Sequence, residues 1–176
     1  MGSPVERKGK GAGRIGKPNA LKPGHDFGAF DCGRDEINHW LKAWARKAIE
    51  ADTARVYVLC RGRKKVLGFY ALAAGGVARE EAPGALRRNC PDPIPVIILA
   101  VLGVDKSEQK QGIGRDLLGD AMRRGVQAAK IVGARALLVH ALDAKAAEFY
   151  IGHGFRPLDE KLETLFATMT SIREHL

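Results

Sequence analysis

The chain has 176 residues, which suits one compact domain with a sizeable core. Its formal net charge is +9, and much of this charge lies before residue 23, where six lysines and arginines stand against one glutamate. No apolar run approaches the length of a membrane span, and the N-terminus lacks the apolar block of a signal peptide. The composition therefore argues against membrane and secreted classes and predicts a soluble cytoplasmic protein without a membrane partner.

The cysteines and histidines show no metal signature. The three cysteines, Cys32, Cys60 and Cys90, are odd in number and widely spaced, and the five histidines are scattered. We therefore expect free thiols in a reducing compartment and no metal site.

The N-terminal residues differ in composition from the rest of the chain. Residues 1–24 are rich in glycine, lysine and proline and poor in apolar side chains. Such a segment cannot bury enough apolar surface to order itself, so we predict a flexible basic tail. Residues 25–176 are then predicted to form the single domain, and no function is assigned to the tail.

The first predicted helix covers residues 33–51, with Asp31 as its N-cap and acidic residues in its first turns. Apolar side chains recur at helical spacing and are expected to form one face. They are Ile37, Trp40, Leu41, Trp44 and Ala48. For the two tryptophans we expect core packing.

Two strands are predicted next, at residues 55–60 (RVYVLC) and 66–74 (VLGFYALAA), joined by a basic turn at residues 61–65. A loop rich in glycine and proline follows, and it carries Arg87 and Arg88. The apolar run IPVIILAVLGV at residues 94–104 then predicts a long strand.

The C-terminal half alternates helices and strands. A helix is predicted after residue 112, followed by a strand at residues 135–141 (RALLVHA), a short helix at 144–152 and a last strand near 164–169. This order predicts a mixed α/β fold, an α+β sandwich around one sheet.

The segment QKQGIG at residues 109–114 lies between the long strand and the next helix. Its glycines let the backbone approach a ligand closely, and the opening turn of the helix has unpaired N–H groups that favour an anion. Two glycines alone are more typical of an ordinary turn. The preceding strand and the apolar stripe of the following helix favour a diphosphate-binding cradle.

Other phosphate-binding motifs do not fit this segment. A P-loop would place Lys and Ser or Thr after the second glycine, and a dinucleotide fold would place an acidic residue after the following strand. Neither pattern is found here.

The order Q-x-x-G-x-G after a strand resembles the acetyl-CoA signature of the GNAT family of N-acetyltransferases. A second motif, FYIGHGF at residues 149–155, supports the resemblance with a tyrosine on the helix after the next strand. The resemblance implies a single GNAT fold, with a central mixed, mostly antiparallel sheet flanked by helices. It also implies acetyl-CoA as co-substrate, bound in the splay between the fourth and fifth strands, with no metal.

Several residues are cofactor-binding candidates through this resemblance. The backbone of Leu102, Gly103 and Val104 would receive the pantetheine arm and the thioester carbonyl. In the cradle the candidates are Gln109, Lys110, Gln111, Gly112, Ile113, Gly114 and Arg115. Around the following short helix they are Asp143, Lys145 and Phe149. Plain surface exposure explains Lys110 and Arg115 equally well, and helix capping explains Asp143.

Tyr150 occupies the position of the family's general acid. A phenol with a pKa of about 10 is protonated at neutral pH and can donate to the departing thiolate. The alternative is a core tyrosine that fills space beside Phe149.

No general base can be assigned. Glu80, Glu81 and Asp105 are ambiguous, and His140 is more typical of a sheet residue. An α-amino group has a pKa of about 7.7 to 8.0, against about 10.4 for lysine, so it is partly neutral without a base. The missing base therefore favours an α-amine acceptor.

A narrower resemblance connects the chain to the GNAT-type toxins of bacterial toxin–antitoxin systems. It is carried by GFYALAAGGV (68–77), LRRNCPDPIPVIILA (86–100), the cradle and LLVHALDAKAAEFYIGHGF (137–155), and it covers most of residues 27–169. One departure is Val101, which stands where the related toxins usually have arginine. The resemblance therefore does not extend to a polar contact at that position.

The toxin resemblance implies a type II toxin that acetylates the α-amino group of aminoacyl-tRNA and inhibits translation. Arg87 and Arg88 would contact tRNA phosphates, unless they are solvated loop charges. The resemblance further implies a homodimer and an antitoxin with a ribbon-helix-helix half, through which operator DNA is bound. Two alternatives stay open: an acetyltransferase for a protein or small-molecule amine, and a non-catalytic regulator that binds acyl-CoA or DNA.

Overall fold

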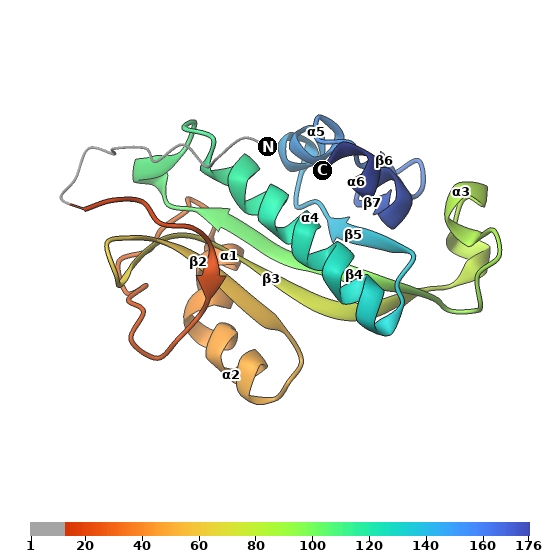
Figure 1. The fold of residues 1–176 in the computed structure, drawn as a ribbon. Helices are drawn as coiled ribbons and strands as arrows, with labels where there is room; N and C mark the ends of the chain where they lie inside the picture. Colours follow the sequence, from red (N-terminus) through yellow and green to blue (C-terminus); the bar gives the residue numbers. More distant parts are fainter. Residues whose placement is uncertain (1–12) are drawn as a thin grey trace. The chain divides into compact units, whose positions relative to one another are not determined.

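The computed structural model describes residues 13–176. In this part of the chain seven strands form one sheet in the order β1-β2-β3-β4-β5-β7-β6 (Figure 1). They are β1 (Asn19–Ala20), β2 (Arg55–Arg61), β3 (Lys65–Val77), β4 (Ile94–Val104), β5 (Ala136–His140), β6 (Arg156–Pro157) and β7 (Thr164–Thr168). β4 pairs with β5 in parallel, whereas β1–β2, β5–β7 and β6–β7 are antiparallel. The predicted mixed, mostly antiparallel sheet is confirmed.

The main helices are α1 (Asp35–His39), α2 (Ala45–Glu50), α4 (Ile113–Val132), α5 (Ala144–Ile151) and α6 (Met169–His175). A π-helical turn, η1 (Trp40–Trp44), joins α1 to α2. Shorter turns are η2 (Arg79–Glu81), α3 (Gly84–Arg87) and η3 (Lys106–Glu108). No helix within residues 13–176 has both the length and the apolar character needed to cross a bilayer.

The chain forms two compact units. The first contains residues up to 71 together with 101–120, and the second contains residues 72–100 and 121–176. The long elements β3, β4 and α4 each begin in one unit and end in the other.

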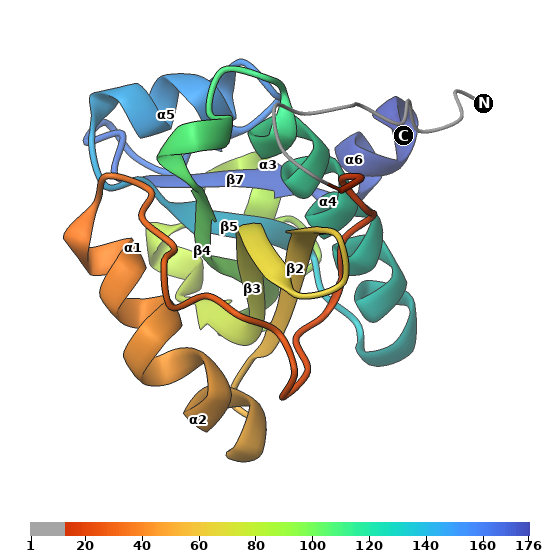
Figure 2. The same cartoon turned by 90° about the vertical axis from the view of Figure 1, so that its left-hand side faces the viewer.

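In the first unit α1 and α2 follow one another beside β2 (Figure 2), and their apolar side chains share a core with β2 and β3. Leu41 and Ala45 are fully buried there. Phe69 packs edge-on against Phe30 at 5.5 Å between ring centroids and stacks with Trp40 at 6.2 Å. The predicted helix at residues 33–51 is therefore confirmed in place, as helical residues 35–50, and Leu41 of its predicted apolar face is buried.

Trp44 departs from the expected core face. Its side chain is 52 % exposed, and the Lys47 ammonium lies 5.1 Å from its ring centroid. Trp44 is the last residue of the π-helical turn Trp40–Trp44, which holds more residues per turn than an α-helix. Its side chain therefore points in a direction that α-helical spacing does not predict.

The predicted flexible tail is only partly described, because residues 1–12 lie outside the described residues. Within residues 13–24, β1 pairs with β2 and forms the edge strand of the sheet. Asn19 and Ala20 pair with β2, the Leu21 N–H donates to the Val56 carbonyl at 2.9 Å, and Leu21 is 8 % exposed. An apolar side chain among the glycines and lysines thus anchors this segment, and the expectation of a free tail up to residue 24 is wrong there.

In the second unit β5 lies between β4 and β7, with its pairing to β7 continuing as far as His140 opposite Thr164. The parallel pairing of β4 with β5 runs from Val96 to Leu99 of β4, and β4 itself continues to Val104. The last part of β4 therefore extends past the paired section, as expected for a strand that splays from its neighbour. The buried core here contains Val77, Ala82, Leu86, Ile94, Val96, Ala136, Leu138 and Phe166.

Candidate functional site

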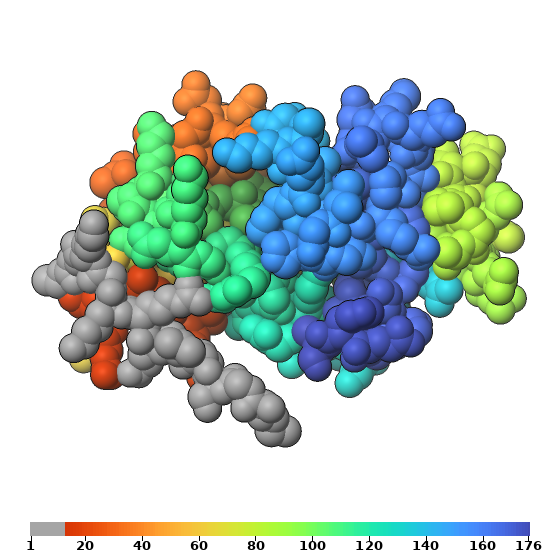
Figure 3. All heavy atoms as spheres, turned by 90° about the horizontal axis from the view of Figure 1, so that it is seen from above, coloured from red at the N-terminus to blue at the C-terminus, as the bar shows by residue number. Residues whose placement is uncertain are grey.

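The predicted cradle is a turn between the end of β4 and the start of α4 in the first unit. Lys110 and Gly112 both adopt left-handed backbone conformations, with φ of 62° and 83°. The Asp116 N–H donates to the Gly112 carbonyl at 3.1 Å, which begins the hydrogen bonding of α4. The N–H groups just before it therefore have no partner within the helix. This turn (green) lies at the surface of the molecule (Figure 3).

The charges around this turn fit an anion. The N-terminus of a 20-residue helix carries partial positive charge, and both Lys110 and Arg115 are exposed beside it. The Arg115 Nε lies 3.6 Å from the Asp116 carboxylate, and both side chains are about half exposed, so this contact leaves the guanidinium available. N–H groups without a partner inside the helix, a left-handed glycine and two cations are suited to a diphosphate.

Gly103 on β4 is glycine for a reason that the motif did not reveal. A Cβ there would lie 2.7 Å from Ile37 Cγ2 and 3.1 Å from Phe69 Cε1, so core packing excludes a side chain. Leu102 and Val104 on either side are half-buried. If this part of β4 receives a pantetheine arm, Gly103 takes part through its backbone.

Gln109 begins the cradle motif, and its side chain is bonded to backbone carbonyls of the protein. Its Nε2 donates to the Cys32 carbonyl at 2.8 Å and to the Val104 carbonyl at 2.9 Å. The amide NH₂ group is therefore used to hold the turn to the chain.

Asp31 and Asp105 both have structural partners. Asp31 is not the predicted N-cap of the first helix, because α1 begins after Arg34, and its Oδ1 instead accepts from Asn38 Nδ2 at 2.9 Å and the Gly33 N–H at 2.8 Å. The hydrogen bond from Asn38, then that from Gly33 and the nearby Lys106 ammonium, lower the pKa of Asp31 to about 2.

Asp105 caps η3, where its Oδ1 accepts from the Ser107 N–H and hydroxyl, while its Oδ2 accepts from the Asp31 N–H. Burial raises the pKa of Asp105, but the hydrogen bonds from Asp31 and Ser107 outweigh it, and the net shift is downward. A carboxylate held in this way is a poor general base.

A buried ion pair lies directly before the cradle, and sequence reasoning missed it. The Arg61 guanidinium donates to the Glu108 carboxylate, with both side chains 8 % exposed. Glu108 Oε2 has no further partner among residues 13–176. Arg61 was predicted in the basic turn, but it is the last residue of β2, and the turn consists of residues 62–64.

Tyr150 lies on α5 in the second unit and is 7 % exposed. Its ring packs edge-on against Phe149 at 5.1 Å and against Phe155 at 5.5 Å between centroids. Burial raises the pKa of Tyr150 to about 12. The phenol is therefore a proton donor and not a base at neutral pH, which agrees with the role expected of it.

The start of α5 agrees with the capping interpretation. The Asp143 Oδ1 accepts from the Ala146 N–H at 2.8 Å, so Asp143 is the N-cap. Lys145 is exposed and Phe149 half-buried. His140 at the end of β5 shares a hydrogen bond of 3.0 Å with the Thr164 hydroxyl, as expected of a sheet residue.

Arg87 and Arg88 lie at the end of α3, a short helix where only a loop was expected, and both are exposed. Leu86 is fully buried and anchors this helix. The Arg135 guanidinium also donates to the Ala85 carbonyl at 3.1 Å. The two arginines are thus presented to solvent from a fixed segment of the second unit.

The described residues contain no group of three or more His, Cys, Asp or Glu side chains placed to hold a metal ion.

These features define a class of protein. A mixed sheet in this strand order, with a glycine turn at the N-terminus of a long helix and a tyrosine on the helix after the next strand, is the architecture of an acyl-CoA-dependent acyltransferase. The model of the acetyltransferase (GNAT) domain matches residues 52–157, more than half of the chain, and the protein belongs to this family. It is an N-acetyltransferase by family, and its acyl donor is acetyl-CoA.

Named relatives include toxins. The chain is 44 % identical over 138 residues to the tRNA-acetylating toxin of Mycobacterium tuberculosis (strain ATCC 25618 / H37Rv), covering 78 % of this chain and 82 % of that protein. The solved structure of AtaT complexed with acetyl-methionyl-tRNAfMet matches with a TM-score of 0.82 and 31 % identity, over 90 % of this chain and 98 % of that one. That of AtaTR bound with AcCoA matches with a TM-score of 0.78 and 32 % identity, over 90 % and 96 %.

Proposed function

We propose that this protein is the toxin of a type II toxin–antitoxin system, which acetylates the α-amino group of aminoacyl-tRNA and thereby inhibits translation. The observation that carries the proposal is its 44 % identity to a tRNA-acetylating toxin over about four fifths of both chains. The buried Tyr150 phenol and the absence of an assignable base on Asp105 or His140 agree with it.

The cradle holds the diphosphate of acetyl-CoA in this proposal. The backbone N–H groups of Lys110, Gly112, Gly114 and Arg115 donate to the diphosphate oxygens, and the side chains of Lys110 and Arg115 add positive charge. Gln111 and Ile113 complete the turn through their backbone. The left-handed Gly112 and the start of α4's own hydrogen bonding at Asp116 support this assignment.

The thioester end is assigned to the last residues of β4. The backbone of Leu102, Gly103 and Val104 receives the pantetheine arm, and fixed N–H groups there stabilise the oxyanion as the amine attacks. Asp143, Lys145 and Phe149 contact the cofactor at the start of α5. The extension of β4 past its pairing with β5 supports this assignment.

Tyr150 acts as the general acid. The acceptor nitrogen bonds to the thioester carbon, the C–S bond breaks, and the sulfur takes the phenolic proton as it leaves. The nitrogen then loses its extra proton to water, and Tyr150 regains one from solvent. With its pKa raised to about 12 by burial, Tyr150 stays protonated before each turnover.

The acceptor needs little help from a base. An α-amine next to an ester is more acidic than an ordinary α-amine, whose pKa is already about 7.7 to 8.0. A neutral fraction is therefore present at physiological pH. The carboxylate of Asp105 and the ring of His140 are both engaged in hydrogen bonds, which agrees with a reaction without a strong protein base.

The tRNA phosphates are assigned to Arg87 and Arg88. Exposed arginines suit phosphate oxygens because the guanidinium is always charged and donates from two sides. Their position at the end of α3, anchored by Leu86, supports a fixed contact surface.

The partners follow from the same proposal. We place the protein in the cytoplasm as a homodimer, neutralised by an antitoxin with a ribbon-helix-helix half that binds operator DNA. Solved structures of AtaT with the C-terminus of the antitoxin AtaR, and of the AtaT–AtaR complex with DNA, support this for related proteins.

The test is transfer of labelled acetyl from acetyl-CoA to a total pool of charged tRNA. Uncharged tRNA and a Tyr150→Phe variant serve as controls. Label that appears only on charged tRNA and is lost with the variant would establish the reaction. No label on tRNA, in a preparation that binds acetyl-CoA, would direct the search to protein and small-molecule amines; binding without transfer to any amine would indicate a regulator.

A further inference from the structure

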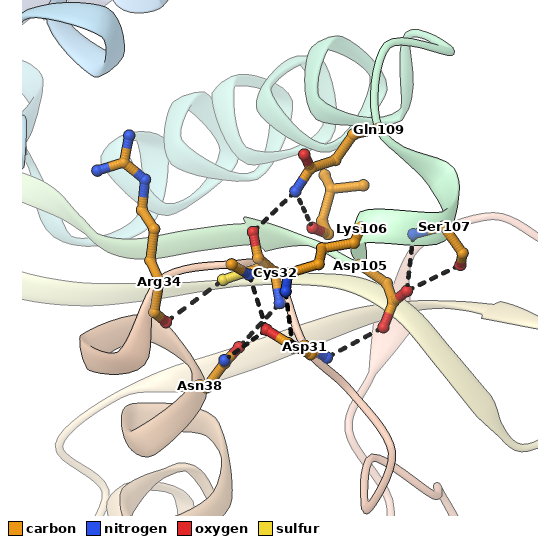
Figure 4. Close-up of polar contacts among 10 residues, drawn as sticks. Asp31, Cys32, Arg34, Asn38, Asp105, Lys106, Ser107 and Gln109 are labelled. Carbon is orange, nitrogen blue, oxygen red and sulfur yellow. Dashed lines mark hydrogen bonds and ion pairs between the residues drawn. The ribbon is translucent and has the colours of Figure 1, made fainter.

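A network of polar contacts ties the cradle to the start of the first helix. The segment around Asp31 lies against η3 and the first residue of the cradle, and both belong to the first unit (Figure 4). These two segments are separated by about seventy residues of sequence, so the contact is tertiary and depends on side chains from both sides.

Gln109 makes the first connection. Its amide nitrogen bridges the Cys32 carbonyl, at 2.8 Å, and the Val104 carbonyl, at 2.9 Å. The side chain of Gln109, the residue directly before Lys110, thus joins the segment before α1 to the end of β4. The position of Lys110 is then fixed from its N-terminal side.

Asp31 makes the second connection. Its backbone N–H donates to the Asp105 Oδ2 at 3.0 Å, and its carbonyl accepts from the Lys106 N–H at 2.8 Å. Its Oδ2 also lies 3.1 Å from the Lys106 ammonium. Backbone and side chain of Asp31 therefore both hold η3, the turn that leads into the cradle.

Asn38 fixes the segment that makes these contacts. From within α1 its Nδ2 donates to Asp31 Oδ1 at 2.9 Å, and its Oδ1 accepts from the Cys32 N–H at 2.9 Å. Asn38 orients the two residues, Asp31 and Cys32, to which η3 and Gln109 are bonded.

The cradle needs such support because of its backbone. Lys110 has a φ of 62°, a conformation that a residue with a long side chain adopts only when its surroundings enforce it. A relaxed turn would move the N–H groups that follow it. Contacts on the N-terminal side of Lys110 are therefore required to keep those N–H groups directed outward.

We propose that Asn38, Asp31 and Gln109 form a clasp that holds the cradle in its diphosphate-binding shape. The three residues act as positioning residues, and Asn38 and Asp31 control acetyl-CoA affinity from the first helix without touching the cofactor. The inference rests on the proposed placement of the diphosphate at residues 110–115.

The test uses two variants that keep shape and remove a donor, Asn38→Asp and Gln109→Glu. Gln127→Glu makes the same chemical change at an exposed position of α4 and is the matched control. We expect the Kd for acetyl-CoA, measured by calorimetry, to rise about tenfold in each clasp variant, as for the loss of one or two hydrogen bonds. The double variant should lose less than the product of the two effects, because both act through one contact network.

Two further readouts separate the clasp from a general loss of structure. Acetyl-pantetheine carries the thioester without the diphosphate, so its KM should stay within about twofold of the parent value, because only the diphosphate contacts weaken. In the ligand-free protein, backbone amide exchange at residues 106–112 should accelerate, while that of β5 is unchanged.

Each result decides a separate point. A parent-like Kd in Asn38→Asp, with binding abolished in Gly112→Val, would overturn the clasp and keep the cradle. Normal acetyl-CoA binding by Gly112→Val would remove the diphosphate from this turn, and with it the site proposed above. An equal rise of the acetyl-pantetheine KM would show that the variants act through general unfolding. If Asn38→Asp fails to fold, Gln109→Glu alone carries the comparison.

Discussion

At the scale of single residues, burial determines what Tyr150 can do. A phenol that is 7 % exposed and packed edge-on by Phe149 and Phe155 is hard to ionise, because the phenolate would lose its hydration. Such a group supplies a proton and does not remove one. The acid and the amine therefore have separate roles: the phenol stays protonated at neutral pH, whereas the amine, with an ordinary pKa of about 7.7 to 8.0, is partly neutral.

We expect Tyr150→Phe to bind acetyl-CoA with a Kd within about twofold of the parent, since the ring packing is retained. Turnover should fall by about a hundredfold or more, the usual contribution of a general acid. Calorimetry and single-turnover acetyl transfer would measure the two effects. Unchanged turnover would remove Tyr150 from the chemistry and leave it a core residue.

The pH dependence of kcat/KM follows from the same separation. The pKa of Tyr150 is raised to about 12, so the acid stays protonated throughout the range from pH 6 to 10. The rate should rise as the acceptor α-amine loses its proton, below or near its ordinary pKa of about 8, and then stay level up to pH 10. A falling alkaline limb below pH 10 would show that a different acid, with a lower pKa, supplies the proton.

At the scale of elements, β2 and η3 are joined by the buried pair of Arg61 and Glu108. The sequence predicts Arg61 in the basic turn between the two strands. In the interior the attraction between the two charges must offset the loss of hydration of both, so either one alone is costly. The pair therefore holds the end of η3 against β2.

Glu108→Gln should lower the free energy of unfolding by about 3 to 5 kcal/mol, because the Arg61 guanidinium is left buried without its counter-charge. Replacing both partners, as Arg61→Met with Glu108→Leu, should recover much of this loss. Urea unfolding of each variant would measure it. Arg55→Met breaks the exposed pair with Asp52 and is the control, with an expected cost below about 1 kcal/mol. A similar small cost for Glu108→Gln would contradict a structural role for the buried pair.

At the scale of the whole molecule, the sequence predicts well those structural features that depend on residues close together in the chain. The apolar run of β4, the stripe of α4 and the Asp143 cap all belong to this class. Two features could not be predicted: one is a local irregularity of a helix, and the other needs partners far apart in the chain. The π-helical turn exposes Trp44, and the contacts of Gln109 cross from η3 to the start of α1; no periodicity reveals either.

Charge, considered over the whole chain, leads to the last prediction. A net charge of +9 attracts any polyanion weakly, so tRNA binding by itself identifies no site. If Arg87 and Arg88 contact phosphates, Arg87→Glu with Arg88→Glu should raise the KM for charged tRNA. The slope of log KM against log salt concentration should fall by roughly one to two, because fewer counter-ions are released on binding. The KM for acetyl-CoA should stay unchanged.

As a control, Arg63→Glu with Lys64→Glu reverses the same charge on the exposed β2–β3 turn and should change the salt dependence less. Equal effects from both pairs would mean that the tRNA responds to overall charge, and α3 would then lose its assignment as the contact surface.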